Sequence, residues 1–163
     1  MKRYALVAFG PERGVIREIF ASLSENGCAV DSCLLTSFGK GFAATILVLG
    51  RRTGLSKTMK EFKGSSVMIK SGQITEADTG APGNIQITLY GAGRPDTLRL
   101  LSEMVSSEGA EITEIESKSL GAMSVVALQA WCPGNTASIR AGLKKLSRRL
   151  GLKASFEKLT PLG

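Results

Sequence analysis

The sequence predicts an α+β protein made of two copies of one βαββαβ unit. Three glycines of the first half recur in matching surroundings in the second half: Gly10, Gly27 and Gly39 correspond to Gly91, Gly109 and Gly121. The spacing is 81 residues for the first pair and 82 for the other two. The second copy therefore carries one extra residue in its first loop, and self-similarity at a fixed spacing indicates a structural repeat.

Each copy begins with an apolar strand, residues 4–9 and 85–90, which runs into a glycine-containing turn. The helix that follows has apolar residues at helical spacing, namely Ile16, Ile19, Phe20 and Leu23 in the first copy and Leu98, Leu101 and Val105 in the second. We expect both helices to end at a glycine, Gly27 or Gly109, in the left-handed region.

Two strands come next, residues 28–37 and 42–49 and then 110–120 and 123–131, and the glycine turn between them favours an antiparallel hairpin. A second apolar pattern predicts another helix, on Leu55, Met59 and Phe62 and on Ile139, Leu143, Leu146 and Leu150. Strands 67–74 and 153–159 close the copies. This order predicts an antiparallel four-stranded sheet with both helices on one face, the ferredoxin-like arrangement.

The element order also predicts the domain organisation. We expect a first domain over residues 1–76, a linker over residues 77–83 that is rich in glycine and contains a proline, and a second domain over residues 84–163.

Composition excludes many activities. The chain of 163 residues has no histidine, which removes the commonest general base and the commonest metal ligand. Walker A, Gly-x-Ser-x-Gly and zinc signatures are absent from the sequence. We therefore predict a protein that is not an enzyme, with no catalytic residue, no metal site and no cofactor. The apolar runs are shorter than a membrane span, so we expect a cytoplasmic protein without membrane contact.

The first turn carries a resemblance to a known family. The segment Gly10-Pro11-Glu12-Arg13-Gly14, between a strand and a helix, resembles the signature turn of ACT domains, and Gly27-Cys28-Ala29-Val30 resembles the segment that follows their first helix. Over nearly the whole chain, two such copies with nothing attached most resemble the glycine cleavage system transcriptional repressor family. The resemblance implies a regulatory protein, often dimeric, involved in transcriptional regulation.

The resemblance also implies a ligand site, classically for an amino acid, at a domain or subunit interface. The expected ligand-binding residues are Gly10, Pro11, Glu12, Arg13, Gly14, Ala29, Val30, Arg94 and Asp96. Elementary chemistry agrees for the turn of the first copy. A glycine-rich turn at a helix start offers unpaired backbone N–H groups and the positive end of the helix dipole, which suit a carboxylate. A turn that only connects strand and helix explains the pattern equally well.

The second copy departs from the family pattern. Asp96 replaces the closely packed glycine, and its carboxylate is expected to cap the helix and to compete with an anionic ligand. Ala29 and Glu111 replace the asparagine of the family, whose side-chain amide would hold the polar groups of a ligand.

Positive charge gathers near the end of the chain. Residues 135–163 hold seven basic residues against one acidic residue, within a net charge of +7. On the last helix the basic residues Arg140, Lys144, Lys145, Arg148 and Arg149 lie opposite the apolar face, and we predict that they bind a protein partner. An ordinary solvated helix face is the alternative.

These observations predict a homodimeric regulator that senses a small metabolite and acts through a protein partner. The competing hypothesis is an RNA-binding module, because RNA-recognition motifs share the βαββαβ order and Lys40-Gly41-Phe42-Ala43 matches the start of their central signature. That hypothesis uses the basic C-terminal helix and Phe42 on the sheet face. Direct nucleic-acid binding is disfavoured because Ala44 stands where a second stacking aromatic belongs.

Overall fold

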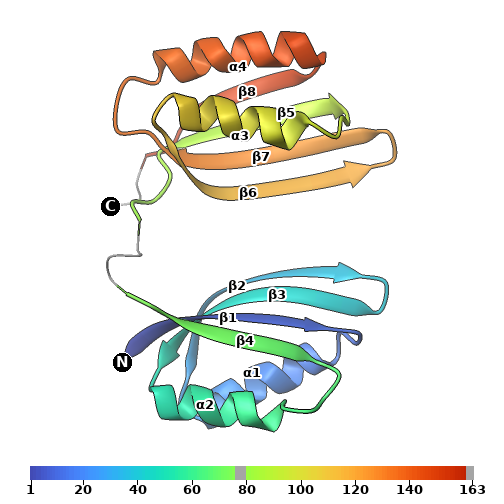
Figure 1. The fold of residues 1–163 in the computed structure, drawn as a ribbon, viewed down its shortest axis with the longest axis vertical. Coiled ribbons are helices and arrows are strands. Elements are labelled where there is room, and N and C mark those ends of the chain that lie inside the picture. Colours follow the sequence, from blue (N-terminus) through green and yellow to red (C-terminus); the bar gives the residue numbers. More distant parts are fainter. Residues whose placement is uncertain (76–79, 161–163) are drawn as a thin grey trace. The chain divides into compact units, whose positions relative to one another are not determined.

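A computed structural model describes residues 1–75 and 80–160 of the chain. The chain divides into two compact units, Met1–Thr79 and Gly80–Gly163. Each unit has the order β-α-β-β-α-β and one four-stranded antiparallel sheet with two helices (Figure 1). The predicted fold class, two ferredoxin-like units, is therefore confirmed.

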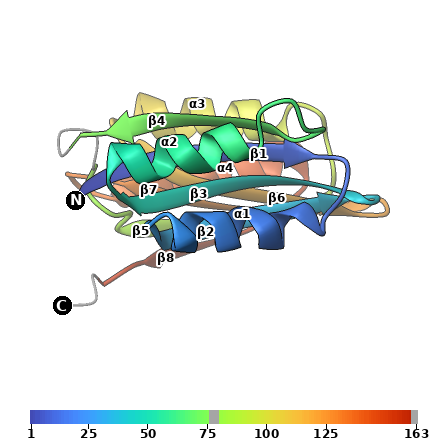
Figure 2. The same ribbon diagram turned by 90° about the horizontal axis from the view of Figure 1, so that it is seen from below.

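Unit 1 contains four strands in the order β2-β3-β1-β4. Figure 2 looks onto its helical face, where α1 and α2 lie over the sheet. The element bounds are β1 Lys2–Gly10, α1 Val15–Glu25, β2 Ala29–Phe38, β3 Gly41–Gly50, α2 Arg52–Glu61 and β4 Met68–Ile74.

Unit 2 repeats this arrangement with the strand order β6-β7-β5-β8. Of the predicted linker 77–83, residues 77–79 lie outside the described residues, and residues 80–84 form neither helix nor strand. The element bounds are β5 Ile85–Ala92, α3 Thr97–Ser107, β6 Glu111–Leu120, β7 Met123–Trp131, α4 Ala137–Leu150 and β8 Lys153–Lys158.

The first helix of each unit ends at the predicted glycine. Gly27 and Gly109 have φ values of 69° and 73°, in the region that side chains other than glycine rarely adopt. After Gly27, the amide of Cys28 donates a hydrogen bond of 2.8 Å to the carbonyl of Leu23, which closes the last turn of α1. The chain can then turn directly from the helix into the edge strand of the sheet.

The internal repeat extends to irregular details. Gly39 and Gly121 each stand first in a two-residue hairpin loop, with φ values of 55° and 63°. The edge strands β2 and β6 each contain a bulge, at Asp31 and Thr113, which are 82 residues apart. The spacing read from the sequence therefore holds through the first three strands of each unit.

Each unit has its own core between sheet and helices. The apolar face predicted for α4 is confirmed, since Ile139, Leu143, Leu146 and Leu150 are all buried. On α3 the predicted apolar face is wrong at Leu98, whose side chain is 40% exposed. Its neighbour Thr97 is 3% exposed instead. The helix α3 thus begins with a threonine facing the core, because Thr97 precedes the buried Leu101 and Val105 at intervals of four residues and shares their face.

A polar network joins α1 to α2 in unit 1. The side-chain amide of Asn26 donates hydrogen bonds to the Ser22 carbonyl at 2.9 Å, to Thr58 Oγ1 at 3.3 Å and to Glu61 Oε1 at 3.0 Å. Hydrogen bonds from Ser22 and Asn26 hold the pKa of Glu61 below its ordinary value. The ionised form of Glu61 therefore stabilises the fold above the pKa that this carboxyl has in the unfolded chain, and the contribution is lost on acidification.

Replacing the amide donor should break this network. We expect Asn26→Asp to lower the free energy of unfolding by about 1–3 kcal/mol at pH 7, because buried acceptors lose their donor and a second carboxylate faces Glu61. The difference from the wild type should shrink near pH 4, where one carboxyl is protonated. Urea unfolding at both pH values measures this.

Asn135→Asp is the matched control. The Oδ1 atom of Asn135 accepts a hydrogen bond of 2.9 Å from the Ala137 amide at the start of α4, and an aspartate keeps that acceptor. We expect no loss of stability for this variant. An equal loss for both variants would contradict the role of the network.

No helix within residues 1–75 and 80–160 combines the length and the apolar character needed to cross a bilayer.

Candidate functional site

The turn after β1 is anchored at its first residue. Gly10 is buried and pairs with Phe42 across the β1–β3 ladder. A Cβ atom at Gly10 would lie 2.8 Å from Cε1 of Phe42 and 3.2 Å from Cγ2 of Val67. This glycine is therefore required by the approach of the Phe42 ring.

The rest of the turn is exposed, but several of its backbone donors are already paired. The Arg13 amide donates to the Lys40 carbonyl at 2.8 Å, and the amides of Val15 and Ile16 donate to the carbonyls of Glu12 and Arg13. This differs from the expected cradle of unpaired N–H groups. The reason is that residues 12–14 already form a helix-like turn, which satisfies the donors at the start of α1 from within.

Gly14 is the open position of the turn. It has helical backbone angles, with φ −59° and ψ −28°, and a Cβ built there meets no atom within 4 Å. Gly14 is thus neither required by backbone strain nor packed inside the unit. Pro11, Glu12 and Arg13 beside it are also exposed, so this side of the turn is accessible to a ligand or another protein surface.

The structure does not bring Ala29 and Val30 to this turn. Ala29 pairs with Leu49, which pairs with Arg3 at the opposite end of β1 from Gly10. Gly10 follows Arg3 by seven positions on β1, about 23 Å at the usual rise per residue. The two halves of the site implied by the family resemblance therefore lie at opposite ends of the sheet of unit 1.

In unit 2 the expected cap is wrong. Asp96 has helical backbone angles, and its side chain makes no capping hydrogen bond at the start of α3. Its Oδ1 atom instead lies 3.4 Å from Nε of Arg94. A capping side chain needs an extended backbone to reach the free amides of the first turn, so the carboxylate pairs with the nearby guanidinium.

The basic side chains of α4 are all exposed, as the sequence predicts. Arg140 makes a cation–π contact within unit 2, since its Cζ atom lies 4.6 Å from the ring centroid of Phe156 on β8. Within the described residues, no acidic group pairs with any of these basic residues: Arg140, Lys144, Lys145, Arg148 and Arg149.

Phe42 does not lie on the open face of the sheet. It is fully buried against the helices, so the base-stacking role that the RNA hypothesis gave it is wrong. The aromatic side chains on the open face of unit 1 are Phe9 and Phe38, whose rings stack with centroids 5.3 Å apart. The sequence signal for Phe9 was the unbroken apolar run of β1, which places apolar residues on both faces of the sheet.

The similarity of this chain to known proteins lies in its fold. No protein-family profile and no curated protein sequence matches the chain. An unknown protein from Galdieria sulphuraria shares the fold with a TM-score of 0.79 and 15% identity, over 98% of this chain and 99% of that one. A protein described as a candidate glycine cleavage system transcriptional repressor matches with a TM-score of 0.68 and 12% identity, over 98% of both chains.

The chain has the tandem ACT-domain fold. The resemblance read from the turn and the repeat is confirmed at the level of the fold, and it extends over both units. Among the described residues, no group of three or more histidine, cysteine, aspartate or glutamate side chains is placed to hold a metal ion.

Two glycines of the same turn should respond oppositely to substitution. We expect Gly10→Ala to lower the free energy of unfolding by about 1–3 kcal/mol, because the added methyl group meets the Phe42 ring. We expect Gly14→Ala to change it by less than about 0.5 kcal/mol. Chemical denaturation of both variants measures the difference. Equal losses would show that the turn needs Gly14 for folding.

Proposed function

We propose that this ACT-domain chain is a regulatory protein without catalytic activity, akin to the glycine cleavage system transcriptional repressor. It senses a small metabolite, an amino acid by preference, and passes the signal to a protein partner. The observation that carries this proposal is the fold shared over 98% of both chains with the candidate repressor. The exposed turn at Gly14 supports it, since this position is free of packing inside the unit.

The site is proposed to form at a domain or subunit interface. Within unit 1, the Gly14 turn and the Ala29 and Val30 segment lie at opposite ends of the sheet. A ligand that contacts both segments therefore needs them from two different copies of the unit. A homodimer supplies such copies, and closed twofold association is the commonest assembly of soluble proteins.

A titration with the twenty amino acids tests the sensing role. We expect calorimetry to detect binding of at least one of them. Gly14→Val should weaken that binding at least tenfold, because its side chain fills the open position. Gly72→Val is the control, since Gly72 on β4 also faces open space but belongs to no proposed site. The absence of heat with all twenty amino acids would refute amino-acid sensing.

The partner is proposed to bind the exposed basic face of α4. We expect the tagged chain to capture a specific protein from cell extract. The double variant Lys144→Glu/Arg148→Glu should lose it, while Lys57→Glu/Lys60→Glu on α2, with the same charge change at exposed positions, should keep it. Equal capture by both variants would exclude the basic face.

The nucleic-acid alternative needs a separate readout. Its remaining support is the basic face together with the exposed pair Phe9 and Phe38. We expect that the protein does not shift the mobility of single-stranded RNA at low salt. A shift that weakens with salt and disappears in Lys144→Glu/Arg148→Glu would replace the protein partner with a nucleic acid.

A further inference from the structure

The two units differ in side-chain size at an aligned position beneath the turn that follows their first strand. The spacing of 82 residues places Ser124 on β7 opposite Phe42 on β3. In unit 1 the Phe42 ring is fully buried beneath the turn after β1. In unit 2 a serine cannot fill the same volume. A pocket of about 440 Å³ lies beside Ser124, between the β5–α3 turn and the end of the β6–β7 hairpin.

Four side-chain hydroxyl groups line the pocket. Thr97, Ser117, Ser119 and Ser124 all contribute to its wall. Thr97 is 3% exposed, and its Oγ1 atom has no hydrogen-bond partner among the described residues. A buried hydroxyl without a partner is unfavourable, and rotation of the Thr97 side chain toward the pocket would let a bound molecule supply the missing partner.

A single cation stands at the pocket. Arg94 lines the pocket, and its Nε atom lies 3.4 Å from Oδ1 of Asp96. The terminal guanidinium nitrogens of Arg94 have no partner among the described residues. The start of α3 adds the positive end of a helix dipole. No aspartate or glutamate belongs to the lining. The pocket therefore offers partners for a carboxylate and for hydroxyl groups, but none of its lining residues offers a carboxylate to an ammonium group.

From this chemistry we infer that unit 2 holds a binding site for a small hydroxycarboxylate. The ligand carboxylate pairs with the free edge of the Arg94 guanidinium, and a ligand hydroxyl bonds with Thr97 Oγ1 and the serine hydroxyls. The volume is within the range of about 300–1,000 Å³ typical of small-ligand pockets. This site lies inside one unit and is separate from the turn at Gly14, so it does not depend on the proposed amino-acid site.

Titration of the full chain with D-glycerate tests the inference. We expect saturable binding in calorimetry, with amide shifts in NMR spectra confined to residues 93–98, 117–119 and 122–124. Propionate, which lacks the hydroxyl groups, should bind at least tenfold more weakly, because a site built for hydroxyls is left unpaired without them. L-Serine, which carries an ammonium group, should also bind more weakly than D-glycerate.

Three variants address the assigned contacts. Arg94→Gln removes the cation and should weaken D-glycerate binding at least tenfold. Thr97→Val removes the unpaired hydroxyl at nearly constant volume, so it should weaken binding while raising the melting temperature of the free protein. Ser117→Leu narrows the pocket from an exposed position and should abolish binding without loss of fold.

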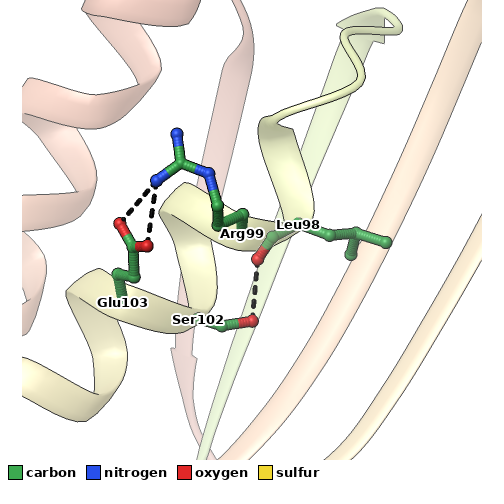
Figure 3. A network of polar contacts seen from close by, with 4 residues as sticks. All are labelled: Leu98, Arg99, Ser102 and Glu103. Carbon is green, nitrogen blue, oxygen red and sulfur yellow. Dashed lines mark hydrogen bonds and ion pairs between the residues drawn. The ribbon is translucent and has the colours of Figure 1, made fainter.

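Arg99→Gln is the matched control. Arg99 lies on the same helix but outside the pocket, and its Nη1 atom pairs with Glu103 at 2.9 and 3.0 Å (Figure 3). It should bind D-glycerate as the wild type does. Absence of D-glycerate binding, stronger binding of L-serine at the same amides, or equal losses in Arg94→Gln and Arg99→Gln would each overturn the inference. Amino-acid binding that shifts only residues 10–14, with no binding of D-glycerate, would overturn it and leave the proposed function intact.

Discussion

Both units depend on one constraint: the chain must turn sharply from the first helix of the unit into the edge strand of the same sheet. A βαββαβ unit buries its core only when α1 or α3 ends abruptly and the chain turns at once into the edge strand. Gly27 and Gly109 make this possible through left-handed backbone angles that other residues adopt only at a cost. The hydrogen bonds that follow each glycine close the helix, so the strand begins at a defined register.

Within this common frame the two units place different side chains at the same end of the sheet. In unit 1 the Phe42 ring fills the space below the turn and fixes Gly10 above it. In unit 2 Ser124 takes the position of Phe42, and Leu152 instead lies close to Gly91. The first arrangement is a packed apolar core, whereas the second leaves a hollow lined by hydroxyl groups. The two units therefore share the scaffold but differ in the chemistry beneath the first turn.

The sequence predicted what depends on spacing and periodicity. The repeat, the strand and helix order, the glycine helix ends and the basic face of α4 all follow from residue types at fixed intervals. It did not predict the hydrogen bonds of the turns, because they depend on backbone angles that the residue types leave open. Asp96 is the clearest example, since its helical backbone directs the carboxylate to Arg94.

The turn of unit 1 separates stability from recognition over five residues. Gly10 is held between the Phe42 ring and Val67, so the first residue of the turn is fixed by the core. Gly14 faces open space, and the intervening amide of Arg13 is tied to the hairpin at Lys40. A surface or ligand that meets Gly14 therefore encounters a backbone already set in place, and binding there requires no rearrangement of the core. Such preorganisation lowers the entropic cost of association, which is consistent with the proposed role of this turn in binding.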